Sequence, residues 1–380
     1  MSPHQSGYTI SSALMCNSSL YMTEEDLIST VIRPEIRALT AYKVADAIGH
    51  IKLDAMENPY TWPEEIKAKW LKVIHDAEIN RYPDPEAKSL CRILKKYNNI
   101  PATSEILLGN GSDEIIQLLL MALPANATVM APEPSFVMYK QVALCLGLNY
   151  QGLPLLADNF ELDLAVTLAT IKSQQPEIIF LAYPNNPTGN LFDSDAIKQI
   201  IQHSKGLVII DEAYAPFTDF SFIEQLPQYK NLLVMRTVSK LGLAGLRLGF
   251  IAGSPNIISE LNKARLPYNI NILTQCSTEF ALSHPDMFAE QTQTICHERA
   301  RVFLQLSTIK EMTPCPSAAN FILFRTPKGK ATSIFNVLKE QGILIKNLSP
   351  QQGLLTDCLR VTIGKPEENN AFIKALKNTI

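Results

Sequence analysis

The sequence predicts an α/β fold, with a mainly parallel sheet in a large domain and a smaller α+β domain. Short apolar runs alternate with helical segments along most of the chain, and the runs are apolar throughout rather than at every second position. Continuous apolarity is typical of parallel strands, since helices cover both faces of such a sheet. Beyond about residue 285 the rhythm changes, and strand-like runs follow a long amphipathic helix.

The start of the chain carries no clear periodic pattern. Residues 1–29 are polar and rich in serine, and we expect a disordered extension or a short arm that lies on a neighbouring molecule. We predict that the large domain spans 64–284. The smaller domain is predicted to combine 30–63 with 285–380.

Two amphipathic helices open the large domain. Apolar residues recur at helical spacing between Ile66 and Ile74 and again between Leu90 and Tyr97. Pro63 lies in the first turn of the first helix, where a missing N–H costs little. Apolar runs bounded by turn residues then predict strands at 106–108, 128–131, 178–182, 207–210 and 232–238.

Helical segments separate most of these strands, notably 113–122 and 195–203. Strands that alternate with helices imply a mainly parallel sheet covered on both sides. In the smaller domain, a helix at about 287–306 leads to strand-like runs, which are 320–324, 343–345 and 359–363.

Bulk properties exclude several classes of function. The formal charge is −3, with 46% apolar and 19% charged residues, so the chain carries no bulk electrostatic signature of a nucleic-acid or membrane partner. No apolar run approaches the roughly 20 residues of a membrane-spanning helix, and the first residues do not resemble a signal peptide. The seven cysteines are scattered without a CxxC pair, and the six histidines lack metal-ligand spacing. We therefore expect a cytoplasmic protein with reduced thiols and no metal.

Polar residues follow four of the predicted strands, at the point where each strand ends. These segments are 109–114, 183–189, 211–214 and 239–240. In open parallel α/β sheets, ligands bind outside the carboxyl ends of the strands. The four segments are therefore expected to meet at one edge of the sheet, and this convergence is the strongest functional signal in the sequence.

Each segment alone has a simpler interpretation. Gly109–Gly111 can be a tight turn before a helix capped by Ser112, Asp211 can form a local turn, and Lys240 can be a solvated charge. Together they fit pyridoxal phosphate catalysis, which needs a lysine for the imine and an acid facing the pyridine nitrogen. The phosphate of that cofactor suits a helix N-terminus with hydroxyl and guanidinium donors.

Several motifs resemble the fold-type I, pyridoxal-phosphate-dependent aminotransferases. Ser239-Lys240 with the glycine-rich stretch up to Phe250 carries this resemblance, which extends over nearly the whole chain after residue 30. Segments 81–85 and 109–114 are similar to the histidinol-phosphate branch of the family. The other matching motifs are 134–136, 184–189, 211–214 and 359–364.

The resemblance implies a role for each matching residue. Lys240 would form the imine with pyridoxal 5'-phosphate and move the proton between the substrate α-carbon and the cofactor, and Asp211 would bind the pyridine N–H. Asp113 would act through its main chain or as a helix cap. The remaining cofactor contacts would be Asn186 and Tyr214 at the ring hydroxyl, Phe136 on the ring face, and Ser112, Ser239 and Arg247 at the phosphate.

Further residues would bind the substrate and complete the site across a dimer. The resemblance implies that Tyr82 reaches the cofactor phosphate of a neighbouring subunit, so that the active unit is a homodimer. Arg360 would clamp a substrate carboxylate through its guanidinium fork. Tyr42, Asn186 and Lys346 would lie near the substrate.

The activity implied by the resemblance is transamination in histidine biosynthesis. Histidinol phosphate and 2-oxoglutarate would give imidazole-acetol phosphate and glutamate. Two departures bear on the substrate, because Lys346 and Met56 stand where arginine and asparagine are common in relatives. An aromatic or broad-specificity aminotransferase and a lyase similar to threonine-phosphate decarboxylase therefore stay open as alternatives.

Two readings from other classes fit less well. A non-catalytic regulator built on this fold would normally need an added DNA-binding module, which is not evident before residue 30. A dinucleotide-dependent oxidoreductase would need GxGxxG, which segment 109–114 does not give, and it would leave Lys240 and Asp211 without a role.

Overall fold

The computed structural model describes residues 22–41 and 44–379, and the chain divides into two units, 1–43 and 44–380. In the described part of the first unit, α1 (Glu24–Val31) and α2 (Pro34–Arg37) are helical. A capping box starts α1, because Thr23 Oγ1 accepts the N–H of Asp26 at 3.1 Å and Asp26 Oδ2 accepts the N–H of Thr23 at 3.2 Å. Part of the predicted extension is thus a capped helix.

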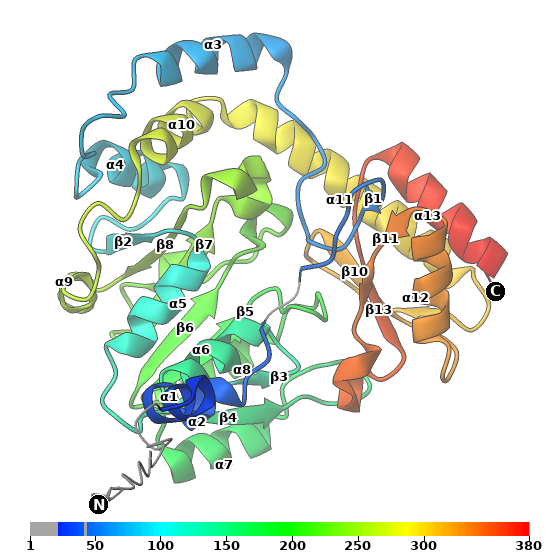
Figure 1. Ribbon diagram of the computed structural model, residues 1–380, viewed down its shortest axis with the longest axis horizontal. Coiled ribbons are helices and arrows are strands. Elements are labelled where there is room, and N and C mark those ends of the chain that lie inside the picture. Colours follow the sequence, from blue (N-terminus) through cyan, green and yellow to red (C-terminus); the bar gives the residue numbers. More distant parts are fainter. Residues whose placement is uncertain (1–21, 42–43, 380) are drawn as a thin grey trace, which may run out of the picture. The chain divides into compact units, whose positions relative to one another are not determined.

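A seven-stranded sheet forms the centre of the second unit, in the order β2-β8-β7-β6-β5-β3-β4 (Figure 1). The strands β2 and β3 to β7 run parallel, and β8 lies antiparallel between β2 and β7. The prediction of a mainly parallel α/β fold is confirmed. The strands are β2 (Glu105–Gly109), β3 (Thr128–Glu133), β4 (Asn149–Pro154), β5 (Ile178–Ala182), β6 (Leu207–Asp211), β7 (Leu232–Thr237) and β8 (Gly249–Gly253).

Helices cover both faces of this sheet, and two apolar cores result. One core joins the sheet to α5, α6 and α9, and the other joins it to α4, α7, α8 and α10. Every residue of β5 is buried, which explains its continuous apolar sequence. The helices are α3 (Glu64–His75), α4 (Lys88–Tyr97), α5 (Ser112–Met121), α6 (Val137–Cys145), α7 (Leu164–Gln174), α8 (Ser194–His203), α9 (Pro255–Asn262) and α10 (Ile272–Leu282).

A smaller α+β region follows, built on an antiparallel sheet in the order β12-β13-β10-β9. Residues of α11, α12 and α13 share one apolar core with β10 and β13. A parallel pair, β1 with β11, ties the segment near residue 51 to this region, while the predicted domain boundaries stay a prediction. The elements are β1 (Ile51–Lys52), α11 (Pro285–Ser307), β9 (Thr313–Pro314), β10 (Phe321–Arg325), α12 (Ala331–Glu340), β11 (Ile343–Leu344), β12 (Lys346–Asn347), β13 (Cys358–Thr362) and α13 (Pro366–Thr379).

Short helical turns complete the structure, and two of them follow the strands that carry the predicted site. The turns are η1 (Ala215–Phe217), η2 (Ile223–Gln225), η3 (Ser239–Leu243), η4 (Ala244–Leu246), η5 (Ser349–Gln351) and η6 (Gly353–Leu355). The turn η3 is a π-type turn directly after β7, and η1 comes shortly after β6.

The strand register brings four strand ends to one edge of the sheet. Asp211, the last residue of β6, pairs with Ala182 of β5 and Met235 of β7. At the start of β8, Gly249 pairs with both Thr237 and Gly109, so the ends of β7 and β2 lie on either side of it. The polar segments that follow these strands therefore share the same edge, as the sequence predicted.

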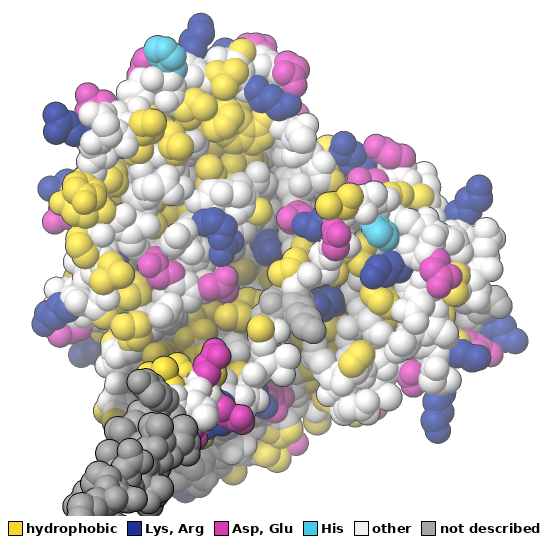
Figure 2. All heavy atoms as spheres, in the orientation of Figure 1, with side chains coloured by type: hydrophobic (Ala, Val, Ile, Leu, Met, Phe, Trp, Pro, Cys, Tyr) yellow, Lys and Arg dark blue, Asp and Glu magenta, His cyan; other side chains and the backbone are white. Residues whose placement is uncertain are grey.

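Charges of both signs are mixed over the face of the molecule that Figure 2 draws. On the face drawn in Figure 2, acidic and basic side chains are interspersed over both the sheet region and the smaller α+β region. Among the helices of the described residues, none is long and apolar enough to span a membrane. Within the same residues, no group of three or more His, Cys, Asp or Glu side chains could hold a metal ion.

Candidate active site

Residues at the ends of β5, β6 and β7 line a cavity of about 380 Å³, and β2 contributes through the helix that follows it. The N-terminus of α5, the turn η3 and the segment 55–57 complete its wall. Most of the site residues predicted from the sequence meet here, namely Ser112, Asp113, Phe136, Asn186, Asp211, Tyr214, Ser239, Lys240 and Arg247.

Lys240 lies in the turn that follows β7, and its Nζ is 3.5 Å from the backbone carbonyl of Ala55. Burial lowers the pKa of Lys240 to about 8, and the positive charges of Arg360 and Arg247 act in the same direction. A lower pKa increases the fraction of neutral amine, which is the nucleophilic form. Lys240 is thus an activated amine in a cavity.

Asp211 ends β6 and is almost completely buried, with 4% of its surface exposed. Its Oδ2 accepts a hydrogen bond from Tyr139 Oη at 2.6 Å, and its Oδ1 accepts the N–H of Ala213 at 3.0 Å. Burial raises the pKa of Asp211 to about 6, although both hydrogen bonds act to lower it. Each oxygen of the carboxylate therefore accepts one hydrogen bond, and these two bonds compensate its charge only in part.

Another part of the cavity wall carries donors that suit an anion. Here α5 begins after Gly111, which has a φ of 85°, and Arg247 lies so close that a Cβ on Gly111 would come within 2.6 Å of its Nη2. Only glycine therefore fits at this turn. Backbone N–H groups at a helix N-terminus and a nearby guanidinium favour a phosphate group.

Two details at this helix differ from the expectation. The N-cap is Gly111 rather than Ser112, because the chain enters the helix through the positive φ that glycine allows. Asp113 forms an ion pair with Arg247, 3.2 Å between Oδ2 and Nη2, instead of capping the helix. A first-turn carboxylate can do this because it projects outward, toward the loop that carries Arg247.

Polar contacts link the large sheet to the smaller α+β region. Asn186 donates through Nδ2 to Tyr214 Oη at 3.1 Å and accepts from Arg360 Nη1 at 2.6 Å. Arg360 also donates to the carbonyl of Asp54 at 3.0 Å, and its guanidinium lies 5.2 Å from the ring centre of Phe321. Arg360 is thus buried and fixed beside Asn186, the cavity residue on the loop after β5.

Lys346 and Tyr82 are not among the described residues that line the cavity. Lys346 lies on β12 directly opposite Arg360 on β13. Tyr82 is 81% exposed and stacks on Tyr268, with ring centres 4.5 Å apart. Tyr42 lies outside the described residues.

Sequence reasoning missed two contributions to the cavity. Tyr139, in α6, reaches the carboxylate of Asp211 from behind, although in the sequence it looks like any apolar-face aromatic. Glu57 lines the wall, and its charge raises the pKa of Lys240 against the lowering effect of burial. Beside it, Met56 has a φ of 52° and is held by the side chains of Thr362 and Asn320.

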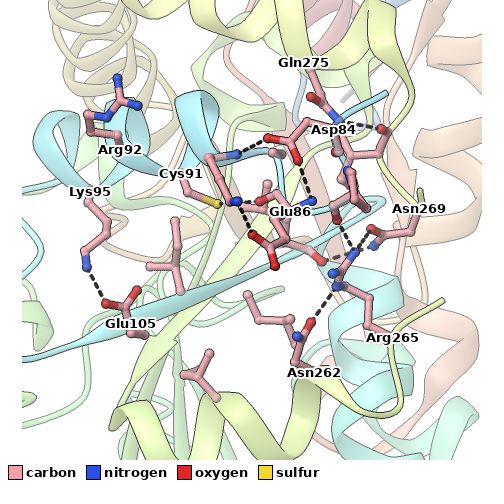
Figure 3. Close-up of a pocket in the computed structure, with 18 of the residues that line it drawn as sticks. Asp84, Glu86, Cys91, Arg92, Lys95, Glu105, Asn262, Arg265, Asn269 and Gln275 are labelled. Carbon is pink, nitrogen blue, oxygen red and sulfur yellow. Dashed lines mark hydrogen bonds and ion pairs between the residues drawn. The ribbon is translucent and has the colours of Figure 1, made fainter. Parts of the chain in front are cut away.

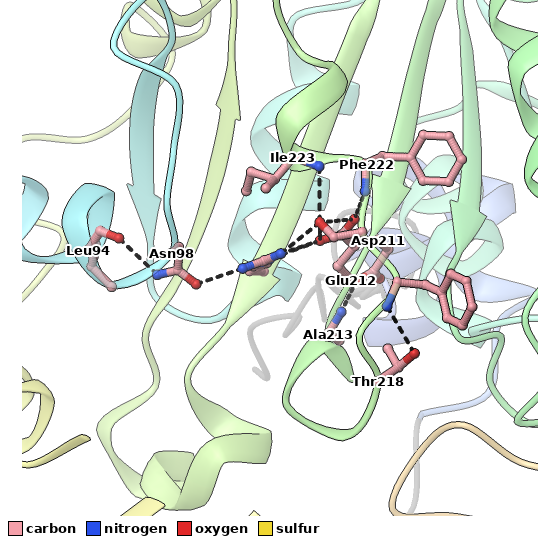
Figure 4. A network of polar contacts seen from close by, with 11 residues as sticks. Leu94, Asn98, Asp211, Glu212, Ala213, Thr218, Phe222 and Ile223 are labelled. Atoms are coloured by element: carbon pink, nitrogen blue, oxygen red, sulfur yellow. Dashed lines mark hydrogen bonds and ion pairs between the residues drawn. The ribbon is translucent and has the colours of Figure 1, made fainter. Parts of the chain in front are cut away.

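The residue after Asp211 belongs to a separate, closed network (Figure 4). Glu212 accepts from Arg236 Nε at 2.9 Å and Nη2 at 2.7 Å, and from the N–H of Phe222. Ser221 Oγ lies 3.0 and 2.9 Å from the two oxygens of Glu212, and Asn98 Oδ1 accepts from Arg236 Nη1. The network joins the ends of β6 and β7 to α4.

A second cavity, of about 600 Å³, lies between α4, β2 and α9 (Figure 3). The strand-end residues Asp211 and Lys240 do not line it. Its polar groups instead hold the segment 81–85, since Arg265 donates to the carbonyl of Pro85 and Gln275 donates to the carbonyl of Asp84. Cavity size alone therefore does not identify the candidate active site.

Comparisons with known proteins agree with this geometry. Residues 48–376 match the family of class I and II aminotransferases. The chain is 54% identical to histidinol-phosphate aminotransferase 2 of Nitrosococcus oceani, over 93% of this chain and 98% of the relative. It is 46% identical to histidinol-phosphate aminotransferase 1 of Ralstonia nicotianae, over 94% and 97%.

Solved structures show the same fold. The chain is similar to the histidinol-phosphate aminotransferase of Sinorhizobium meliloti in complex with pyridoxal-5'-phosphate, with a TM-score of 0.80 and 23% identity over 92% of this chain and 97% of that one. The corresponding enzyme of Clostridium acetobutylicum gives a TM-score of 0.78 and 24% identity over 86% and 98%. These likenesses confirm the predicted fold-type I architecture.

Proposed function

We propose that this chain, which belongs to the family of class I and II aminotransferases, transfers the amino group of histidinol phosphate to 2-oxoglutarate, with pyridoxal 5'-phosphate as its cofactor. The observation that carries the reaction type is the meeting of Lys240, Asp211 and an anion-binding helix N-terminus in one cavity. The substrate rests on the names of relatives that are 46–54% identical to nearly the whole chain.

The residues present fit this cofactor. An aldehyde needs an amine with a lowered pKa, which is Lys240, and a pyridinium needs a carboxylate, which is Asp211. A phosphate needs the N-terminus of α5 with Arg247, and the absence of a Cβ on Gly111 lets the guanidinium lie close to that N-terminus. When bound, pyridoxal phosphate supplies an electron sink for the pair of electrons left on the substrate α-carbon.

Each residue then has a defined task. Lys240 would take the proton from the substrate α-carbon and return it to the cofactor. An amine with a pKa of about 8 can both accept and donate a proton near neutral pH. Asp211 would hold a proton on the pyridine nitrogen. Asn186 and Tyr214 would bind the ring hydroxyl, and Phe136 would cover the ring face.

The phosphate of the cofactor and the acidic group of the substrate need separate cations. Ser239, Arg247 and the backbone N–H groups of Ser112 and Asp113 would hold the former. Arg360, fixed by Asn186 and Asp54, would meet the carboxylate of glutamate or the phosphate of histidinol phosphate. Lys346 lies opposite Arg360 on the neighbouring strand.

We also infer a homodimer whose sites are completed across the interface. Tyr82 and Tyr268 stack on each other at the surface, and Leu266 and Leu273, near Tyr268 in the sequence, are 72% and 43% exposed. Exposed apolar groups of this kind favour a partner surface, and Tyr82 would contact the neighbour's cofactor phosphate. Light scattering would give twice the monomer mass. A cytoplasmic location stays a prediction.

The proposed reaction is tested by its first half. Purified protein loaded with cofactor is mixed with histidinol phosphate in the absence of any keto acid, and the absorption of the cofactor is followed. We expect conversion to pyridoxamine phosphate by histidinol phosphate, with much slower conversion by phenylalanine at the same concentration. Equal conversion by phenylalanine would indicate a broad-specificity aminotransferase instead.

Two further outcomes separate the remaining alternatives. Release of carbon dioxide from threonine phosphate, without conversion of the cofactor, would indicate a lyase. The variant Lys240→Ala serves as the control, because it keeps the phosphate-binding groups but lacks the reactive amine. If the wild-type protein shows no cofactor absorption, or if Lys240→Ala converts the cofactor as well as wild type, the proposal is wrong.

A further inference from the structure

Tyr139 lies behind the candidate active site and contacts its buried acid. The side chain comes from α6 and is completely buried. Its hydroxyl is 2.6 Å from Asp211 Oδ2, a short distance that is typical of a hydrogen bond to a charged acceptor. Tyr139 does not line the cavity itself, so it can act on bound molecules only through Asp211.

The direction of this hydrogen bond is fixed. Burial and the neighbouring carboxylate raise the pKa of Tyr139 far above its usual value, so the phenol stays protonated and donates. Above the pKa of Asp211, which is about 6, the acceptor is the ionised carboxylate. On its other oxygen, Asp211 accepts the N–H of Ala213 at 3.0 Å. Two donors from different elements therefore set the plane of the carboxylate.

Tyr139 also stabilises the aromatic wall of the site. Its ring stacks on Phe180 with centres 4.6 Å apart and an angle of 7°. It meets Phe136 edge to face, at 5.5 Å and 84°. A phenylalanine would make the same ring contacts, and a buried hydroxyl costs stability unless it is hydrogen-bonded. The hydrogen bond to Asp211, and not the packing of the ring, therefore accounts for the presence of the hydroxyl.

The negative charges around Asp211 make the hydrogen bond from the hydroxyl of Tyr139 important. The negative charges of Asp113 on α5 and Glu212 directly after β6, together with burial, favour the protonated form of Asp211. Tyr139 and the N–H of Ala213 are the groups that favour the ionised form. A protonated Asp211 would offer a proton to the pyridine nitrogen instead of a negative charge that holds one there.

We propose that Tyr139 is a positioning residue for the reaction, which keeps Asp211 ionised and oriented toward the pyridine nitrogen of the cofactor. The identity of the cofactor in this statement rests on the proposed function. The hydrogen bond between Tyr139 and Asp211 does not, and it can be tested in the protein without any cofactor.

The first experiment uses Tyr139→Phe, which removes the hydroxyl and keeps the ring. In cofactor-free protein, the titration of Asp211 is followed by carbon NMR of labelled aspartate, and its signal is identified by its loss in Asp211→Asn. We expect the pKa of Asp211 to rise in Tyr139→Phe. The matched control is Tyr97→Phe, because Tyr97 is a half-buried tyrosine on α4 and the side-chain hydrogen bonds of Asp211 come from Tyr139 and Ala213, so it should leave the titration unchanged.

The second experiment measures the cofactor. Loss of a hydrogen bond to a charged group corresponds to a change of roughly tenfold or more, so Tyr139→Phe should raise the Kd of pyridoxal phosphate about tenfold. The pH midpoint of the cofactor's absorption should shift as well. In the Asp211→Asn background, Tyr139→Phe should have no further effect on either quantity.

A second variant carries a stronger hydrogen-bond donor at position 139, so the proposal can be tested even if Tyr139→Phe folds poorly. Replacing Tyr139 with 3,5-difluorotyrosine keeps nearly the same shape and should lower the pKa of Asp211, opposite to phenylalanine. An unchanged Asp211 titration in both variants would overturn the proposal, as would equal effects of Tyr139→Phe with and without Asp211. If no cofactor binds to wild type, the proposed function fails, while the titration still decides the role of Tyr139.

Discussion

Two neighbouring carboxylates at the end of β6 have opposite surroundings. Asp211 faces the candidate active site, and Glu212 points into the network of Arg236, Ser221 and Phe222 (Figure 4). Both residues are buried, with 4% and 1% of their surface exposed. Among the described residues, Glu212 has a cation as its partner, whereas the side chain of Asp211 accepts from the hydroxyl of Tyr139 and the N–H of Ala213.

This difference separates a structural charge from a functional one. A buried carboxylate with an arginine and several donors is satisfied within the protein and ties elements together. A buried carboxylate without a cation remains able to bind one, at the expense of stability. The alternation of side chains along a strand sends the two residues to opposite sides, so one strand end serves both purposes.

The largest expected effect is on stability, and it comes from changing Glu212, the structural carboxylate of the two. Glu212→Gln removes the counter-ion of Arg236, whose side chain is only 14% exposed, and should lower the free energy of unfolding by about 3–5 kcal/mol. Urea unfolding of the cofactor-free protein measures this. The half-reaction rate of the folded variant should change much less than that of Asp211→Asn.

A double variant distinguishes loss of the ion pair from general disruption. Arg236→Met alone leaves Glu212 buried without its cation, and it should also be strongly destabilising. Glu212→Gln combined with Arg236→Met should be less destabilised than the sum of the single variants. Strict additivity would show that Glu212 and Arg236 are not coupled. It would then contradict the structural role that separates Glu212 from Asp211.

Asp211→Asn should have the next largest effect, and on activity rather than stability. Loss of one preorganised electrostatic contact in an active site costs on the order of 100- to 1,000-fold in rate, and a neutral amide cannot hold a proton on the pyridine nitrogen. Stopped-flow absorption with histidinol phosphate measures the half-reaction. An Asp211→Asn variant with a wild-type rate would contradict the role assigned to this carboxylate.

The stability of the wild type relative to this variant should depend on pH in a defined direction. The pKa of Asp211 is about 6 when folded and near 3.8 when unfolded, so the folded state binds more protons between these values. Raising the pH through this window therefore removes stability from the wild type, by about 1–3 kcal/mol in total, and not from Asp211→Asn. Urea unfolding of both cofactor-free proteins at pH 5 to 8 tests this. A stability difference that is constant over this range would show that the pKa of Asp211 is not raised.

Much of the fold could be predicted because it rests on local patterns. The strands β5 and β6 are apolar throughout and are bounded by turn residues, and the structure places them within one residue of the prediction. The strands β4 and β8 were not predicted. In β4 only Leu153 is buried, and β8 has glycine at both ends, so neither carries the pattern of a central strand.

The meeting of the site residues could also be predicted, because parallel strands bring their carboxyl ends to one edge. The side-chain contacts behind that edge could not be predicted. Tyr139 and Asp211 are far apart in the sequence, and Arg236 finds Glu212 only because β6 and β7 are neighbours. Such pairings depend on side-chain directions in the folded state, which a single sequence does not specify.

The smallest expected effect is at the edge of the Glu212 network. Ser221 Oγ lies within 3.0 Å of both oxygens of Glu212, accepts from Arg236 Nη2 at 2.9 Å, and accepts the N–H of Ile223 at 3.0 Å. Ser221→Ala should lower the free energy of unfolding by about 1–2 kcal/mol, because Glu212 keeps its arginine and loses only one neutral donor. Urea unfolding of the cofactor-free variant measures the loss. A loss as large as that of Glu212→Gln would mean that the hydroxyl, and not the arginine, stabilises this carboxylate, and that Glu212 is less different from Asp211 than the ion pair implies.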